Sequence, residues 1–267
     1  MRLGRGVVAG LAGLLVLFLG LPVATLVARA VGGGTLAATF ADPVVFDALS
    51  LSLGTTACSL ALTVLLGTPL AFALARRQFR GSGLVETVID LPIVLPPSVA
   101  GLALLLVFGR RGLLGESFEL VGVTIPFTTL AVILAQVFVA APFFVRSARA
   151  GFASVDRDLE DAARVDGAGE RGVFRWITVP LAGSALAAGL VMSWARALGE
   201  FGATIMFAGN VAGRTQTLPL VVYSEFQGGG LDTSIAAAAV LVLAAFGILV
   251  AVRVLRWGRA LDVRPGR

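Results

Sequence analysis

The chain has 267 residues, of which 57% are hydrophobic and only 14% are charged, and its formal net charge is +5. Water-soluble domains carry about 25% charged residues, so this composition excludes a soluble globular protein and predicts an integral membrane protein. Histidine is absent, and the single cysteine, Cys58, lies inside an apolar run, so zinc, haem and disulfide frameworks lack their usual ligands. The basic residues, all arginines, lie mainly at the ends of apolar runs. We therefore expect contact with membrane lipid and no nucleic acid.

Six apolar runs approach or exceed the length of a membrane-spanning helix, which needs about 20 residues to cross the hydrocarbon core. The alternating pattern of a membrane barrel is absent, so we predict an all-α integral membrane protein with six transmembrane helices. The predicted spans are residues 7–30, 49–75, 88–108, 126–145, 181–205 and 233–255. The first run also resembles a cleaved signal ending in "ARA" at 28–30, although its apolar part is longer than a usual signal core.

The arginines predict the orientation, because an excess of basic residues marks the cytoplasmic side of a membrane protein. One side carries most of them: Arg2, Arg5, Arg76, Arg77, Arg80, Arg146, Arg149, Arg157, Arg164, Arg171, Arg175, Arg253, Arg256, Arg259, Arg264 and Arg267. The opposite side has Arg29, Arg110, Arg111 and Arg214. Both termini and the long loop after the fourth span are therefore predicted to be cytoplasmic.

The third span opens with a proline-rich stretch, "DLPIVLPPSVAG", at residues 90–101. Pro92, Pro96 and Pro97 remove backbone donors that neighbouring groups or water must replace. Two interpretations stay open. The stretch is either a simple helix start or kink, or a broken helix that lines a pathway.

A charged segment, "EDAARVDGAGERGVFRWITVPL", separates the fourth and fifth spans. Its first part predicts a short helix, because four carboxylates gather where they complement the positive end of a helix dipole: Asp156, Asp158, Glu160 and Asp161. Leu159, Ala162 and Ala163 are three and four residues apart and form one small apolar face. Gly167 and Gly169 are expected to end this helix.

A second helical turn is predicted at residues 172–177, and Pro180 then suits the opening of the fifth span. Two short helices with a compact alanine face would fit a groove on another protein. An amphipathic loop resting on lipid headgroups explains the residues equally well. The residues alone leave both interpretations open.

Arg196 and Glu200 are the only ionisable residues well inside a predicted span, and charges within a membrane are functional candidates. Four residues apart, they face each other along one side of a helix and neutralise one another. The pair is either structural or part of a gate near the external end, where Gly199 and Gly202 allow close helix approach. A tight anion site at Arg196 alone is not expected, because Glu200 would repel a dianion unless protonated or turned away.

The charged segment resembles the signature of ABC importer permeases: Glu-Ala-Ala, three residues, Gly, nine residues, Ile, one residue, Leu-Pro. The spacing is intact, with Asp161 in place of Glu, partly covered by the adjacent Glu160, and Val179 in place of Leu. The matching positions are Asp161, Ala162, Ala163, Gly167, Ile177, Val179 and Pro180. The resemblance covers the chain from about the second span onward.

This resemblance implies the type I ABC importer permease fold, in which the segment is a coupling helix that docks into a separate cytoplasmic ATPase. It assigns residues 1–48 to an N-terminal helix and external loop, 49–255 to the permease domain with the coupling segment at 152–180, and 256–267 to a cytoplasmic tail. The chain has no "GxxxxGK[ST]" phosphate loop, so ATP and its Mg²⁺ are expected on the partner, with no metal or cofactor on this chain.

Two longer stretches, at residues 91–115 and 194–223, resemble the permeases of molybdate importers, with tungstate and sulfate permeases close behind. The implied function is ATP-driven molybdate import by alternating access in the plasma membrane of a prokaryote. The implied partners are a second permease copy, two ATPase subunits and an extracytoplasmic molybdate-binding protein. Tungstate or sulfate is the alternative substrate.

Candidates for the pathway or gate come from the third and fifth spans: Pro96, Pro97, Ser98, Arg196, Gly199, Glu200, Gly202 and Thr204. Hydroxyl groups such as those of Ser98 and Thr204 offer an oxyanion weak hydrogen bonds, which suit conduction better than tight ones.

Two other classes explain the residues less well. An intramembrane enzyme needs nucleophiles or metal ligands within the spans, and these are lacking apart from one cysteine and one charge pair. An ATP-independent anion channel fits the hydropathy but leaves the charged segment unexplained. We therefore expect a transport subunit that is not itself an enzyme.

Overall fold

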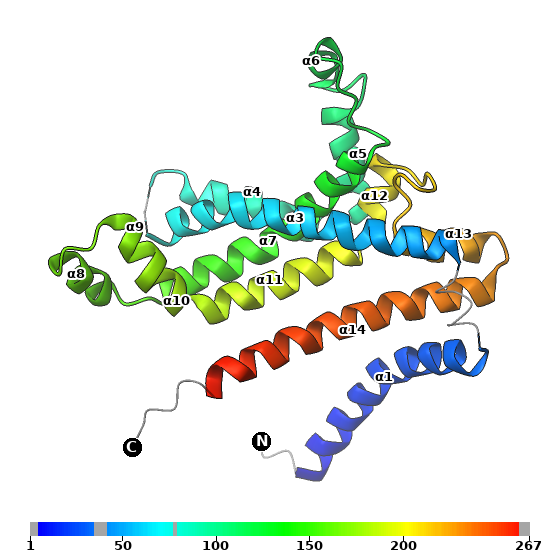
Figure 1. The fold of residues 1–267 in the computed structure, drawn as a ribbon, viewed down its shortest axis with the longest axis horizontal. Coiled ribbons are helices and arrows are strands. Elements are labelled where there is room, and N and C mark those ends of the chain that lie inside the picture. The colour runs from blue at the N-terminus through cyan, green and yellow to red at the C-terminus, as the bar shows by residue number, and fades with distance from the viewer. Residues whose placement is uncertain (1–4, 35–41, 77–78, 262–267) are drawn as a thin grey trace. The chain divides into compact units, whose positions relative to one another are not determined.

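The protein is described by a computed structural model that covers residues 5–34, 42–76 and 79–261, with side chains described from Gly6 to Val250 within these ranges. The described residues form helices and turns without a β-strand (Figure 1), which confirms the predicted all-α class. The elements are α1 (Arg5–Gly32), α3 (Pro43–Arg76), α4 (Ser82–Val94), α5 (Pro97–Phe108), α6 (Gly115–Leu120), α7 (Thr129–Ala153), α8 (Arg157–Val165), α9 (Glu170–Val173), the π-helical turn η1 (Phe174–Thr178), α10 (Val179–Leu181), α11 (Gly183–Leu198), α12 (Gly202–Phe207), α13 (Leu218–Gln227) and α14 (Leu231–Leu261).

Several arginines that predict the orientation lie outside the residues or side chains that the structure describes. Arg2, Arg77, Arg264 and Arg267 lie outside the described residues. The same holds for the side chains of Arg5, Arg253, Arg256 and Arg259. The cytoplasmic placement of both termini therefore stays a prediction.

The helices fall into two compact units, and each is described by itself. One unit consists of Met1–Ser50 and Thr217–Arg267, and the other of Leu51–Gln216. In the first unit, α1 and α13 each pack along α14. Its core joins the start of α3 to α13 and α14 through small and branched apolar side chains: Val45, Ala48, Leu218, Val221, Ala237 and Val240.

Four helices in the described part are long and apolar enough to cross a membrane by themselves, namely α1, α3, α7 and α14. They confirm the first, second, fourth and sixth predicted spans. Two bent pairs, α4 with α5 and residues 170–181 with α11, bring the number of spans to as many as six if each pair is one span.

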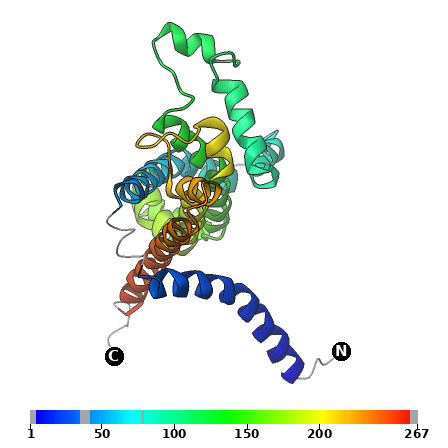
Figure 2. The ribbon, with the colours of Figure 1, turned by 90° about the vertical axis from the view of Figure 1, so that its right-hand side faces the viewer.

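The third predicted span, 88–108, is wrong as a single helix. It is interrupted between α4 and α5, which meet at an angle of 119° (Figures 1 and 2). Leu95 and Pro96 are extended, with ψ of 134° and 136°, because a residue that precedes proline is driven out of the helical region. Pro97 then starts α5, where its missing donor costs nothing. The structure shows that the helix is broken, and the pathway that it was expected to line stays a prediction.

The fifth predicted span, 181–205, is also not continuous. Residues 170–181 and α11 meet at a bend of 71°, and α11 ends at Leu198. Three non-helical residues follow before α12 begins at Gly202. The Ala203 N–H donates to Glu200 Oε1 at 2.7 Å, so one donor of the interrupted backbone is satisfied within the protein.

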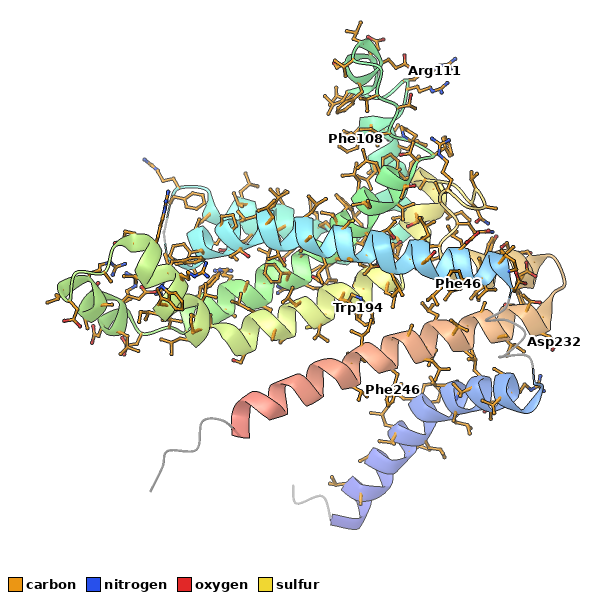
Figure 3. The ribbon with its side chains drawn as sticks, viewed as in Figure 1. Phe46, Phe108, Arg111, Trp194, Asp232 and Phe246 are labelled. Atoms are coloured by element: carbon orange, nitrogen blue, oxygen red, sulfur yellow. The ribbon has the colours of Figure 1, made fainter. Side chains whose placement is uncertain are left out.

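The two broken spans pack against each other through glycines on α5 and α12. A Cβ added at Gly101 would lie 2.6 Å from the Ala203 carbonyl oxygen, and one at Gly202 would lie 2.8 Å from Pro97 Cβ. Phe108, labelled in Figure 3, contacts Phe207 with ring centroids 6.2 Å apart. The absence of side chains at the glycines lets the two backbones approach closely, as is common between membrane helices.

Small residues also join α7 to α11 in the second unit. A Cβ on Gly189 would lie 2.9 Å from Ser147 Cβ, and one on Gly151 would lie 2.6 Å from Ala185 Cβ. The Ser193 hydroxyl donates to the Ala140 carbonyl at 2.6 Å, and the Ser147 hydroxyl donates to the Ala185 carbonyl at 2.7 Å. Close contact and hydrogen bonding hold such helices together where lipid weakens the hydrophobic driving force.

We predict that Gly101→Val destabilises the protein by about 1–3 kcal/mol, because the new side chain overlaps the backbone of α12. Gly83→Ala in α4 is the matched control, since no atom lies within 4 Å of its added Cβ. Thermal unfolding of the detergent-purified protein measures both variants. Equal melting temperatures for the two variants would show that the α5–α12 contact contributes nothing.

Candidate functional site

The charged segment begins with the short helix that the sequence predicts. The Asp156 side chain caps α8 by accepting the Asp158 N–H at 3.0 Å, and the acidic first turn complements the helix dipole. Gly167 follows the helix with a φ of +92°, a left-handed conformation that favours glycine. The predicted start and end of this helix are thus confirmed.

The second part of the segment is longer than the predicted turn at 172–177. It runs as one helical stretch through α9, η1 and α10. The π-helical turn ends at Thr178, two residues before Pro180. A proline removes one backbone donor, and widening of the preceding turn is a common way to absorb that loss.

Glu160 is the centre of a buried polar cluster that joins three elements. Its Oε1 accepts a hydrogen bond from Arg76 Nη2 at 2.6 Å and another from the Thr178 hydroxyl at 2.6 Å. Arg76 Nη1 also donates to the Val155 carbonyl at 3.3 Å. The end of α3, the helix α8 and the turn η1 are therefore connected through one carboxylate. We name Arg76, Glu160 and Thr178 the anchor cluster.

Three phenylalanine rings pack together near the anchor cluster. Phe72 of α3 meets Phe152 at a centroid distance of 5.5 Å and Phe174 at 5.1 Å, both nearly edge to face. Such ring pairs contribute about 0.5–1.5 kcal/mol beyond the area they bury. A pocket of about 390 Å³ is lined by Phe72, Phe174, Glu160 and Thr178 and reaches Arg164 and Glu170.

Asp161 has a different environment from Glu160, although the two are adjacent. Asp161 is exposed and accepts a hydrogen bond from Arg164 at 2.6 Å. Arg164 also donates to both carboxylate oxygens of Glu170, at 2.8 and 3.2 Å, and so links α8 to α9. These hydrogen bonds lower the pKa of Glu170 and raise the pKa of Arg164, so both groups stay charged at neutral pH.

The segment exposes several large apolar side chains among its charged ones. Leu159, Val165 and Trp176 expose 51%, 88% and 70% of their surface. Ala162 is exposed, whereas Ala163 is half-buried. Isolated exposed apolar residues are ordinary, but three large ones within 18 residues of a short helical segment suit a protein contact.

Two further ion pairs tie α4 to the end of α7. Arg149 contacts Glu86 at 2.8 Å, and Arg146 contacts Asp90 at 3.5 Å. Sequence reasoning used these arginines only for orientation and missed their partners, as it missed the pairing of Arg76 with Glu160. The sequence offers one signal for these pairs: Glu86 and Asp90 are acidic residues close to the side of the membrane that the arginines mark as cytoplasmic.

The candidates from the two broken spans meet in the structure. Gly202 packs against Pro97, and its added Cβ would lie 3.2 Å from the Ser98 nitrogen. Pro96, Pro97 and Ser98 are exposed, whereas Thr204 is fully buried. Thr204 therefore offers no open surface in this structure.

Arg196 and Glu200 form the expected ion pair, with Arg196 Nη1 next to Glu200 Oε2. The pair spans the end of α11 and does not lie along one continuous helix. The Glu200 side chain is fully buried, whereas 29% of the Arg196 side chain is exposed. Among the residues that the structure describes, no group of three acidic or cysteine residues is placed to hold a metal ion.

Comparison with known proteins places these features in a family. Residues 64–264 match the family described as binding-protein-dependent transport system inner membrane component. The chain is 36% identical to the molybdate/tungstate transport system permease protein WtpB of Pyrococcus abyssi, over 93% of both chains. It is 46% identical to the molybdenum transport system permease protein ModB of Mycobacterium bovis, over 67% of both chains.

A solved structure has the same fold. The chain aligns with a bacterial ABC transporter involved in the import of the acidic polysaccharide alginate, with a TM-score of 0.75 over 97% of this chain and 95% of that one. The two sequences are 18% identical, so this likeness concerns the fold.

We predict that Glu160→Gln lowers the free energy of unfolding by about 3 kcal/mol, because it leaves the buried Arg76 guanidinium without a counter-charge. Asp161→Asn is the adjacent control and should cost less than about 1 kcal/mol, since its ion pair is exposed and Arg164 keeps Glu170. Denaturant titration of the purified protein gives both values. A loss for Asp161→Asn as large as that for Glu160→Gln would contradict the role of the anchor cluster.

Proposed function

The chain belongs to the family of binding-protein-dependent transport system inner membrane components, as a permease subunit of an ATP-driven importer, and we propose that its substrate is molybdate. It is an integral membrane protein of a prokaryote and not an enzyme. The observation that carries the substrate proposal is the identity of 36% over nearly the full length to a permease named for molybdate and tungstate.

Tungstate and sulfate remain the alternative substrates. All three ions are tetrahedral dianions, and a binding protein outside the membrane normally makes the choice among them. The permease would then conduct whichever of these ions the binding protein delivers to it. An ATP-independent channel does not agree with membership of a family of ATP-driven importers.

We further propose that segment 152–180 is the coupling segment that docks into a cytoplasmic ATPase subunit. Its exposed apolar side chains, Leu159, Val165 and Trp176, support this proposal, since a partner would cover them. The residues that the resemblance assigns to coupling are Glu160, Asp161, Ala162, Ala163, Gly167, Ile177 and Pro180. Glu160 is buried in the anchor cluster, so it would act by holding the segment in place. ATP and Mg²⁺ would be held by that partner.

The proposed assembly contains a second copy of this chain, two ATPase subunits and an extracytoplasmic molybdate-binding protein. Both termini would face the cytoplasm, with 1–48 as an N-terminal helix and loop, 49–255 as the permease domain and 256–267 as the tail. Solved relatives in fold include an alginate transporter in complex with a substrate-bound periplasmic protein, which supports this type of assembly.

The contacts of the anchor cluster provide a route from the motor to the membrane helices. Force applied to α8 reaches α3 through the Glu160–Arg76 bond, and reaches α11 through Thr178 and the bend that follows it. The nucleotide state of the ATPase would then bias which side of the bundle is open.

Uptake of labelled molybdate should require this gene, and excess tungstate should compete strongly while excess sulfate competes little. The measurement compares cells with and without the gene. Unchanged molybdate uptake together with lost sulfate uptake would contradict the substrate proposal and leave the permease role intact.

Ala163→Trp should abolish ATP-driven uptake while the protein stays inserted in the membrane, because the bulky ring prevents α8 from docking. Ala12→Trp is a matched control at an exposed position of α1, which lies before the family match. Uptake and membrane abundance are measured for both variants. Full uptake by Ala163→Trp would contradict docking through this face.

A further inference from the structure

We propose that Arg196 is a transit contact for the oxyanion: its free guanidinium edge meets the substrate within the membrane, and Glu200 keeps the contact weak. The proposal rests on the transport of a dianion and goes beyond it by assigning a residue of the pathway.

The first support is the unequal exposure of the ion pair. The Glu200 side chain is fully buried, and 29% of the Arg196 side chain is exposed. Arg196 Nη1 forms an ion pair with Glu200 Oε2, and its guanidinium has no hydrogen-bond acceptor among the described residues. A guanidinium has five N–H donors, so most of them stay available to a planar or tetrahedral oxyanion.

The second support is the direction in which the two carboxylate oxygens of Glu200 point. Its Oε1 accepts the Ala203 N–H at 2.7 Å, and its Oε2 faces Arg196. Both oxygens thus point into the protein, with no exposed surface of their own. The sequence predicts that Glu200 repels a dianion unless it is protonated or turned away. In this structure the carboxylate is buried from solvent but faces Arg196, so its charge weakens the attraction of Arg196 for the ion and does not cancel it.

The third support is the surface around Arg196. Met192 and Ala195 of α11 and Gly199, which directly follows it, are exposed near Arg196 in the sequence, and none of them carries a polar side chain. Trp194, labelled in Figure 3, marks this part of α11. An exposed guanidinium inside a membrane span faces a water-filled cavity or another protein chain, because exposure to lipid tails is too costly.

The opposite charges of Arg196 and Glu200 suit the passage of a dianion. A lone buried arginine would hold a dianion tightly, whereas a guanidinium partly neutralised by Glu200 attracts it without trapping it. Conduction requires binding that is favourable enough for the ion to arrive and weak enough for it to leave.

The decisive experiment compares Arg196→Gln with the double variant Arg196→Gln/Glu200→Gln in the full transporter in proteoliposomes, with labelled molybdate, tungstate and sulfate in turn. The double variant removes both charges and keeps an amide oxygen for the Ala203 N–H. We expect uptake of each transported ion by both variants to stay roughly tenfold or more below wild type. Recovery of wild-type uptake in the double variant would show that the pair is only structural and would overturn the proposal.

A second measurement tests access from water. In a Cys58→Ser background, Arg196→Cys should react with a membrane-impermeant thiol reagent in at least one nucleotide state of the transporter, and molybdate should slow that reaction. No labelling in any nucleotide state would overturn the proposal. Failure of the wild-type transporter to carry any of the three ions would instead refute the proposed function.

Discussion

The ion pair between Arg76 and Glu160 is the constraint on which the rest of the account depends. A buried charge is tolerated only when a counter-charge and hydrogen bonds compensate for lost water. The 2.6 Å contact between these groups therefore fixes α8 to the end of α3, and Thr178 adds the connection to η1. The segment exposes large apolar side chains among its charged ones, while its buried side is held by the anchor cluster. Exposed side chains serve a partner, and buried ones hold the segment to the bundle.

The membrane region follows a related rule, which is that interrupted helices must satisfy their backbone within the protein. The chain interrupts the third and fifth predicted spans, at residues 95–96 and 199–201, and packs the pieces after these interruptions, α5 and α12, against each other. Glu200 serves both the interrupted backbone and Arg196. A single carboxylate thus supports the break and limits the charge that Arg196 presents.

Sequence patterns predicted those features that depend on neighbours along the chain. The all-α class, four unbroken spans and the capped helix α8 follow from hydropathy, acidic first-turn residues and glycine position. The consecutive prolines gave two interpretations of the third span, because backbone chemistry shows that a helix is perturbed but not by how much. The break after Leu198 was missed because apolar residues resume after Glu200, so the predicted span was carried on to residue 205. The anchor cluster was missed because Arg76 and Glu160 are 84 positions apart, and an arginine at the end of a span is already explained by topology.

The most direct test of the account is the number of molybdate ions imported per ATP hydrolysed, measured in proteoliposomes for wild type and for Arg76→Leu/Glu160→Leu. Apolar replacement of a buried ion pair commonly preserves folding, so the variant separates coupling from stability. If the anchor cluster transmits the motor's movement, ATP hydrolysis stimulated by the loaded binding protein continues while import per ATP falls. An unchanged ratio of import to hydrolysis would contradict the account.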